Sequence, residues 1–393
     1  MSPSHQNTTV VIIGAGVAGL TLGAFLLHKG IDCVILEKHS REYVEQRQRA
    51  GVIDTRAARM FREWGLEDRV IGGSPTQPVL NFRIDDETRP LTMDADDHRD
   101  GRFCPQRVLV HNLMDVFIGD GGDIRFEAEV ALGDIAGDRP HVTYRDSTGS
   151  TTTISCDFVA GCDGDRGVSR AAIPSGHLTR YSHEYGYAWL TVLAEVPANH
   201  QSLMAIHSRG FAGQFARGPQ ASRFYLQVPL DTALADWTHD RIWDEIEARF
   251  AEPVPSRGSI STTTLVPLRS IVYSPMRYGH LYLLGDAAHI VPPMSAKGMN
   301  LALHDAEAFA NAVIRYQTQD HDTSLLDSYS STCLHHVWNY QAFAAWFTDM
   351  MHNAGDASYQ GDFKRQSARA ELQRLFESPS ANRPFSEFIA GLN

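Results

Sequence analysis

The chain has 393 residues, of which 43% are hydrophobic, and a formal net charge of −12. This length allows roughly two to three domains with large cores. The acidic balance argues against nucleic acid as a main partner, because phosphate binding requires clustered Lys and Arg. An anionic small molecule would need a local basic pocket that works against the overall charge.

The five cysteines are odd in number and none lies in CxxC spacing, which suits a reducing compartment better than a disulfide framework. His335 and His336 are adjacent, so on a helix they point about 100° apart and cannot share a metal as an i,i+4 pair can. We expect no metal. The N-terminus lacks the pattern of a signal peptide, and no stretch of about 20 apolar residues could span a bilayer. We therefore expect a cytoplasmic protein without a membrane partner.

The first predicted strand, residues 10–13, runs directly into the sequence Gly14-Ala15-Gly16-Val17-Ala18-Gly19, and a helical pattern follows. The first glycine permits a tight turn, the second lets a pyrophosphate approach the backbone, and the third lets helix and strand pack closely. A second strand, residues 33–36, ends in Glu37, near the spacing at which a carboxylate binds ribose hydroxyls. The pattern predicts a dinucleotide site; the alternative is a glycine-rich turn in an ordinary βαβ unit.

The later elements alternate between helical and strand patterns. We expect helices at 55–64, 105–118, 238–250, 301–316, 324–352 and 364–393, and strands near 125–131, 140–147, 156–160 and 280–284. The middle, 180–275, is rich in Tyr, Phe, Val and Thr with short alternation, which indicates a mostly antiparallel sheet. The acidic run 94–100 is typical of a solvated turn.

Two further Gly–Asp elements, Asp163-Gly164 and Gly285-Asp286, each follow a predicted strand. The carboxyl ends of strands in an open α/β sheet face one crevice where ligands bind, and an Asp there can bind ribose or ribitol hydroxyls. Each element alone is an ordinary turn. In this order and spacing they predict a shared ligand site with the Gly14–Gly19 loop.

These three elements, together with Arg47–Val52, Pro267–Ser270 and Gly285–Asn300, resemble the single-component FAD-dependent aromatic hydroxylases, the class A flavoprotein monooxygenases. The resemblance covers nearly the whole chain and is greatest to the members that act on 4-hydroxybenzoate. It implies an α/β fold (α+β overall) with a Rossmann-type FAD-binding domain, an inserted, mostly antiparallel substrate domain and a helical C-terminal region. The implied ranges are 1–77, 103–180 and 276–320 for the FAD-binding domain, 78–102 and 181–275 for the substrate domain, and 321–393 for the helical region.

The resemblance also implies tightly bound, non-covalent FAD, NADPH or NADH as a transient reductant, and O₂ as co-substrate. Oxygen would pass from a flavin C4a-hydroperoxide to the ring of a small aromatic acid. We also expect a homodimer. Glu37 would hold the adenosine ribose, and the helix starting near Gly298 would aim its N-terminus at the flavin ring. The implied FAD contacts are Gly14, Gly16, Ala18, Gly19, Glu37, Lys38, Arg47, Arg49, Gln106, Asp163, Asp286, Lys297, Gly298, Met299 and Asn300.

The positions that match or replace the family's NAD(P)H contacts are Lys38, His39, Tyr43, Arg49, Arg170 and Arg269. The basic pair Lys38-His39 favours NADPH over NADH, because it could accommodate a 2′-phosphate. The alternative is that both residues are merely exposed.

Three residues are the implied catalytic group. Arg217 and Tyr225 match the residues that bind the substrate carboxylate, and the Pro293 carbonyl faces the substrate in the family. A guanidinium pairs with a carboxylate in a bidentate fork, which suits Arg217 to this role. The alternative for Arg217 is a solvated loop arginine.

The chain departs from the 4-hydroxybenzoate hydroxylases around the substrate ring. Two tyrosines, a serine and a threonine of those enzymes are replaced by Met204, Ile389, Phe215 and Met294, and Gln77 is the nearest match to a proton-relaying histidine. Such a pocket cannot pair a phenolic hydroxyl, and leaving a polar group unpaired costs roughly 1–3 kcal/mol. We expect an aminobenzoate, an amino-hydroxybenzoate or a larger aromatic acid.

Three alternatives remain open. Tyr187, Gln214 or Ser295 could replace the missing hydroxyls, with 4-hydroxybenzoate still the substrate. The same flavin chemistry could N-hydroxylate an aromatic amine. The chain could also be a flavin-bound sensor or binding protein without turnover.

Overall fold

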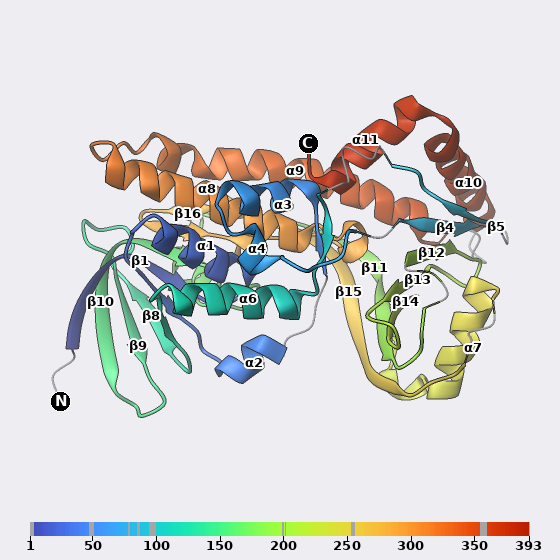
Figure 1. Ribbon diagram of the computed structural model, residues 1–393, viewed down its shortest axis with the longest axis horizontal. Coiled ribbons are helices and arrows are strands. Elements are labelled where there is room, and N and C mark those ends of the chain that lie inside the picture. Colours follow the sequence, from blue (N-terminus) through green and yellow to red (C-terminus); the bar gives the residue numbers. More distant parts are fainter. Residues whose placement is uncertain are drawn as a thin grey trace.

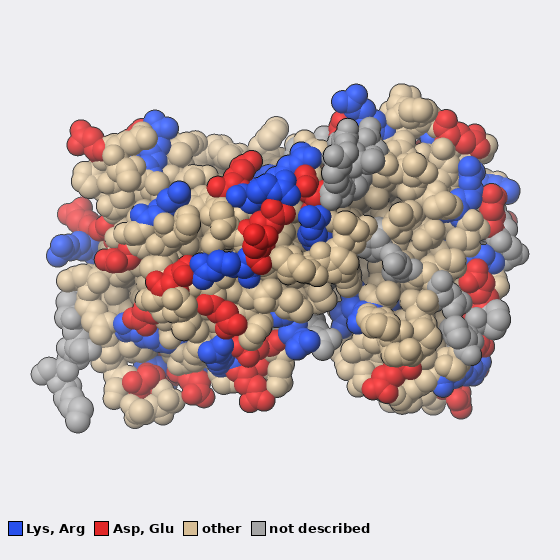
Figure 2. Space-filling view, viewed as in Figure 1, with Lys and Arg blue, Asp and Glu red and all other residues tan. Residues whose placement is uncertain are grey.

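The structure is a computed structural model that describes residues 4–46, 51–77, 79–84, 87–93, 100–198, 200, 202–252, 256–353 and 360–392. The predictions for Arg47, Arg49 and residues 94–99 lie outside the described residues. Figure 2 shows basic and acidic side chains interspersed over the face in view. Within the described chain, no helix is both long and apolar enough to cross a membrane.

A mostly parallel sheet organises the N-terminal part of the chain. Its strands run in the order β16-β17-β10-β1-β2-β7. In addition, β9 pairs with the first half of β10, and β8 pairs with β9. The bounds are β1 (Ser4–Ile13), β2 (Cys33–Leu36), β7 (Asp123–Arg125), β8 (Glu129–Gly133), β9 (His141–Arg145), β10 (Thr151–Gly161), β16 (Arg277–Tyr278) and β17 (Leu281–Leu283). The helices α1 (Val17–His28), α6 (Gln106–Gly119) and α8 (Gly298–Thr318) run alongside this sheet (Figure 1).

The parallel register brings the three glycine elements together. Ile13, Gly161 and Leu283 are aligned on neighbouring strands β1, β10 and β17. Each of these residues is followed within two positions by one of the glycine elements, at Gly14, Asp163 and Gly285. The three elements therefore lie side by side at the carboxyl edge of the sheet, as predicted.

The second sheet is mostly antiparallel, in the order β18-β15-β11-β14-β13-β12-β4-β5. Its bounds are β4 (Asn81–Ile84), β5 (Glu87–Pro90), β11 (Thr179–Ala194), β12 (Ser202–Ile206), β13 (Ala212–Ala216), β14 (Ser222–Pro229), β15 (Ile260–Ser274) and β18 (His289–Ile290). One face packs against α7 (His239–Phe250) through a buried apolar cluster. The opposite face packs against the C-terminal helices α9 (Ser324–Met351), α10 (Gly361–Glu377) and α11 (Pro379–Ala390) (Figure 1).

Short elements complete the structure. They are α2 (Arg41–Gln46), α3 (Thr55–Glu63), α4 (Glu67–Val70), the paired strands β3 (Val52–Ile53) and β6 (Arg102–Phe103), and the 3₁₀ turns η1 (Arg170–Ala172), η2 (Leu234–Asp236), η3 (Gly285–Ala287) and η4 (Pro293–Ser295).

The predicted α/β fold class is confirmed, and two details differ. The single strand expected near 125–131 is wrong, because β7 and β8 are separated by a turn in which Glu127 adopts a φ of 54°. Backbone N–H groups of this turn donate to the carbonyls of Glu37 and His39 instead of to a neighbouring strand. In addition, β18 lies in the range assigned to the FAD-binding domain but pairs with β15 of the second sheet. The domain boundaries stay a prediction.

Candidate active site

The three glycines of the first loop have different surroundings. A Cβ on Gly14, whose φ is +104°, would lie 2.5 Å from the Cys162 carbonyl oxygen, and a Cβ on Gly19 would lie 2.0 Å from the Gly14 carbonyl oxygen. A Cβ on Gly16 would have no atom within 4 Å. Gly14 and Gly19 therefore serve close packing, as does the buried Ala18, whereas Gly16 leaves space for a ligand above the N-terminus of α1.

Glu37 is buried beside this loop at the end of β2. Its Oε2 accepts a hydrogen bond from the Ala15 N–H at 2.8 Å, and its Oε1 accepts one from the His39 N–H at 2.9 Å. The carboxylate is thereby fixed where a ribose would follow the pyrophosphate. Lys38 is exposed next to it, and the rings of His39 and Tyr43 pack at a tilt with centroids 4.1 Å apart. The structure thus gathers these predicted residues at the surface beside Glu37.

The two Asp-containing turns at the sheet edge are each held by internal hydrogen bonds. Asp163 Oδ2 accepts from the Ser169 N–H at 2.8 Å and from its hydroxyl at 3.0 Å. Asp163 Oδ1 is buried and has no hydrogen-bond partner in the described part of the chain, and burial raises the pKa of this carboxyl. The Gly285 N–H, next to Asp286, donates to Asp305 Oδ2 at 2.8 Å. The Asp163 carboxylate also lies against Gly167 of its own turn, where a Cβ would be 1.9 Å from Asp163 Cγ, so it holds this turn together.

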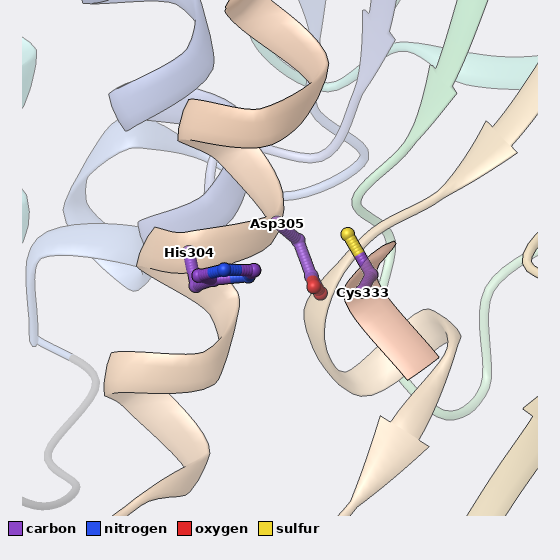
Figure 3. Close-up of side chains that lie close together, drawn as sticks. All are labelled: His304, Asp305 and Cys333. Atoms are coloured by element: carbon purple, nitrogen blue, oxygen red, sulfur yellow. The ribbon is translucent and has the colours of Figure 1, made fainter. Parts of the chain in front are cut away.

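The carboxylate of Asp305 also binds His289 Nε2 at 2.7 Å. Burial disfavours both charges, yet the contact raises the pKa of His289 and lowers that of Asp305. His304, Asp305 and Cys333 offer ligand-type atoms within 4.8 Å of one another (Figure 3). His304 and Asp305 are consecutive on α8, and Asp305 already holds the turn at Gly285 and binds His289. We interpret this cluster as the support of that turn and not as a metal centre.

The N-terminus of α8 is locked by buried polar side chains. Lys297 Nζ donates to Asp54 Oδ2 at 2.7 Å and to the Ile389 carbonyl at 2.8 Å, and burial lowers the pKa of Lys297. Asn300 accepts from the Asp54 N–H at 3.1 Å and donates to the Val52 carbonyl at 3.0 Å. These side chains are bound inside the protein, so contacts of Lys297, Gly298, Met299 and Asn300 with FAD would come from the backbone.

Gln106 is the first residue of α6 and is half-buried. Arg170 and Arg269 meet at Asp165, which follows the Asp163-Gly164 turn. Arg269 binds Asp165 Oδ2 at 2.6 Å. Arg170 donates to the carbonyls of Asp165 and, at 2.8 Å, Ala287, and its guanidinium lies 4.3 Å from the Tyr273 ring centroid.

The residues predicted to surround the substrate ring come together on the second sheet's face toward the C-terminal helices. Met204, Met294 and Ile389 belong to one buried apolar cluster, and Phe215 and Tyr225 pack against it. Pro293 precedes Met294 in η4, and its carbonyl accepts a hydrogen bond from the Ala296 N–H at 3.0 Å.

Arg217 lies just beyond β13, beside this cluster. It is half-buried, with its guanidinium 5.1 Å from the Phe103 ring centroid, and it has no carboxylate partner among the described residues. Burial lowers the pKa of Arg217, and Arg223 nearby lowers it further, whereas Tyr225 raises it. An anionic ligand would supply the missing countercharge.

Arg223 is a site residue that the sequence reasoning missed. It is opposite Phe215 in the β13–β14 register and two residues before Tyr225, so all three side chains share one face. Its Nε is buried with no hydrogen-bond partner in the described chain. The alternation along Ser222–Pro229 was the signal that could have found it.

The three residues suggested as replacements for the lost hydroxyls differ in position. Gln214 is opposite Leu203 and Phe224, which both belong to the cluster under α7, so it faces away from Phe215. Tyr187 stacks on His352 with ring centroids 4.7 Å apart. The Ser295 hydroxyl is buried, without a hydrogen-bond partner in the described structure.

His352 was also missed. Its Nδ1 lies 2.7 Å from the Thr348 carbonyl, so Nδ1 carries the hydrogen and Nε2 accepts from the Trp189 Nε1–H at 2.8 Å. Burial lowers the pKa of His352 to about 3, so the ring is neutral. Trp189 in turn lies against Tyr225, with ring centroids 4.8 Å apart. His352 therefore orients the aromatic wall behind Tyr225.

Comparison with known proteins defines the class to which this fold and site belong. The family model described as an FAD binding domain matches residues 7–344. The chain belongs to this family and is an FAD-dependent aromatic hydroxylase.

Among its relatives, a p-hydroxybenzoate hydroxylase of Acinetobacter baylyi is 35% identical over 400 residues, covering 98% of this chain and 96% of that protein. A probable NADH-specific resorcinol 4-hydroxylase of Rhodococcus jostii is 24% identical, covering 85% of this chain and 63% of that protein. The crystal structure of a p-nitrophenol 4-monooxygenase from Pseudomonas putida shares the fold, with a TM-score of 0.86 at 18% identity, and covers 99% of this chain and 100% of that one.

The residues at the sheet edge fit FAD. Gly16 leaves open space at a helix N-terminus, and the Ala15 N–H fixes the Glu37 carboxylate beside this loop. NAD(P)H and O₂ are the co-substrates usual in this class.

Proposed function

We propose that this enzyme hydroxylates a small aromatic carboxylic acid whose carboxylate binds Arg217 and Tyr225. The observation that carries the proposal is the half-buried guanidinium of Arg217, which has no acidic partner in the described chain. A desolvated cation is stable only when paired, and Arg matches a carboxylate in a two-pronged geometry. The name of the Acinetobacter relative, a p-hydroxybenzoate hydroxylase, supports an aromatic acid.

The ring would lie against Met204, Phe215, Met294 and Ile389. None of these side chains donates a hydrogen bond, so they would not hold a phenolate. The buried Ser295 hydroxyl is one group on η4 that could pair with a polar ring substituent. We therefore propose a hydroxybenzoate-like or aminobenzoate-like acid and not a strict requirement for a phenol.

Bound FAD supplies the redox and oxygen-transfer chemistry that the side chains lack. The protein binds the carboxylate, orients the ring with its apolar wall and excludes water from it. The N-terminus of α8, which has no side-chain cap, presents backbone N–H groups that favour negative charge. We propose NADPH or NADH as reductant, bound at the predicted positions Lys38, His39, Tyr43, Arg49, Arg170 and Arg269.

The test measures NAD(P)H oxidation by the FAD-loaded enzyme with hydroxybenzoates, aminobenzoates and the corresponding anilines and phenols that lack a carboxylate. We expect stimulation and an oxygenated product, identified by mass spectrometry, only with the acids. An N-hydroxylated product would point to amine oxidation. Stimulation without product from every acid would contradict the proposal.

A further inference from the structure

Asp165 is a carboxylate placed among the arginines predicted to receive the nicotinamide cofactor. It lies in the loop after β10 and binds Arg269 of β15 through Oδ2 at 2.6 Å. The pair therefore joins the loop at the edge of the first sheet to the second sheet. The side chains of Arg269 and Asp165 are 35% and 24% exposed, so a solute can reach and exchange this ion pair.

Arg170, in contrast, binds mainly backbone carbonyls at this position. Its guanidinium donates to the backbone carbonyls of Asp165 and Ala287 and lies over the ring of Tyr273. Its contact with the Asp165 carboxylate is long, at 3.5 Å. The backbone contacts hold the loop in place, so the side-chain charge of Asp165 acts mainly on Arg269.

A depression of about 370 Å³ lies beside Arg170, which contacts Asp165. Arg170 and Tyr273 line it together with Pro174 and Leu178. An aromatic ring and a guanidinium group beside an open depression suit a planar, phosphate-bearing ligand. In a chain with a net charge of −12, such a local basic site is the kind that an anionic cofactor requires.

We propose that Asp165 occupies Arg269 in the free enzyme and competes with a phosphate of the nicotinamide dinucleotide for it. The inference rests on the proposed use of NAD(P)H. Binding of the dinucleotide exchanges one anion for another at Arg269 and releases the carboxylate to solvent. Asp165 thus lowers the affinity for the nicotinamide dinucleotide without taking part in flavin reduction.

The test is anaerobic reduction of the enzyme-bound flavin, followed by its absorbance, at increasing NADPH or NADH with a stimulating aromatic acid present. The concentration dependence separates the dissociation constant from the limiting rate. Asp165→Asn removes the charge but keeps the loop, because the backbone carbonyl still holds Arg170. Glu63→Gln, an exposed carboxylate at the end of α3, is the control for the same change in net charge.

We expect Asp165→Asn to lower the dissociation constant about two- to fivefold, the range of a partly exposed ion pair, with a limiting rate within about twofold of wild type. The gain should vanish when Arg269→Gln is also present. Equal constants in Asp165→Asn and Glu63→Gln, or a gain that persists without Arg269, would overturn the proposal. If neither nucleotide reduces the wild-type flavin, the proposed reductant itself is wrong, and the inference falls with it.

Discussion

Substitution of Gly16 tests the ligand-binding role of the glycine loop without disturbing its packing. The Gly16 φ of −81° suits any residue, and a Cβ there meets open space, so Gly16→Ala should fold normally. The added methyl would displace the FAD pyrophosphate from charged hydrogen bonds worth roughly 1.5–3 kcal/mol, which corresponds to about 10- to 100-fold weaker FAD binding.

The measurement is the dissociation constant of FAD, together with the thermal unfolding of each apoprotein. Gly119→Ala on α6 is the matched control, since its Cβ would meet only an Arg69 nitrogen at 4.0 Å. Gly19→Ala should instead destabilise the fold, because its Cβ would lie 2.0 Å from a backbone oxygen. Unchanged FAD affinity in Gly16→Ala would contradict the placement of the pyrophosphate.

Arg217 carries the substrate assignment. Truncation of one partner of a buried charge pair costs about 2–5 kcal/mol, so Arg217→Ala should raise the KM for the aromatic acid about 30-fold or more. Arg217→Lys should have a KM between those of wild type and Arg217→Ala, because an ammonium keeps the charge but loses the bidentate geometry. Steady-state kinetics checks this, with the exposed Arg180→Ala as control. A KM that stays at the wild-type value would remove the carboxylate from this site.

At the scale of elements, the lock between α8, α3 and α11 positions the helix end that is predicted to face the flavin. Lys297 is 2% exposed and joins Asp54, which caps α3, to the last turn of α11. Lys297→Met would leave Asp54 buried without its countercharge, which costs about 3–5 kcal/mol.

The holoenzyme's thermal unfolding midpoint should therefore drop strongly in Lys297→Met. In the control Lys364→Met, an exposed pair with Asp349 is lost and the midpoint should change little. Equal midpoints in the two variants would mean that the buried pair does not hold these elements together.

Features that depend on local contacts could be predicted from the sequence, whereas features that depend on distant contacts were missed. The strand, glycine loop and second strand up to Glu37 could be predicted, because turn chemistry and alternation are local. Gln214 and Phe215 are consecutive in β13, so the alternation of side chains along a strand could also have predicted that they lie on opposite faces of the sheet. The partners of Lys297 and His352 could not, because Ile389 lies 92 residues and Trp189 lies 163 residues away. Strand pairing and helix docking bring such residues together, and no local pattern encodes them.

At the scale of the molecule, buried histidines make stability depend on pH. The native pKa of His352 is about 3, whereas in the unfolded chain it is about 6.5. Between these values the unfolded state binds a proton that the native state does not, so stability falls as the pH drops below about 6.5. At pH 5 this amounts to about 2 kcal/mol. Burial also lowers the pKa of His304 and His336, which adds to the loss in the same direction.

Unfolding midpoints between pH 7 and 5 test this. His352→Gln keeps an acceptor for Trp189 and should show a shallower decline than wild type. His335→Gln, at an exposed position on α9, should follow the wild-type curve. A decline in His352→Gln as steep as that of wild type would contradict a neutral His352 in the native state.

We propose that this FAD-dependent hydroxylase recognises an aromatic ring through a carboxylate and an apolar wall. The most direct measurement is turnover under ¹⁸O₂ of matched pairs of aromatic compounds, with and without a carboxylate, followed by mass spectrometry of the product. We expect one ¹⁸O atom in the product of at least one aromatic acid and no product from its partner without the carboxylate. Equal product from both members of each pair would contradict it.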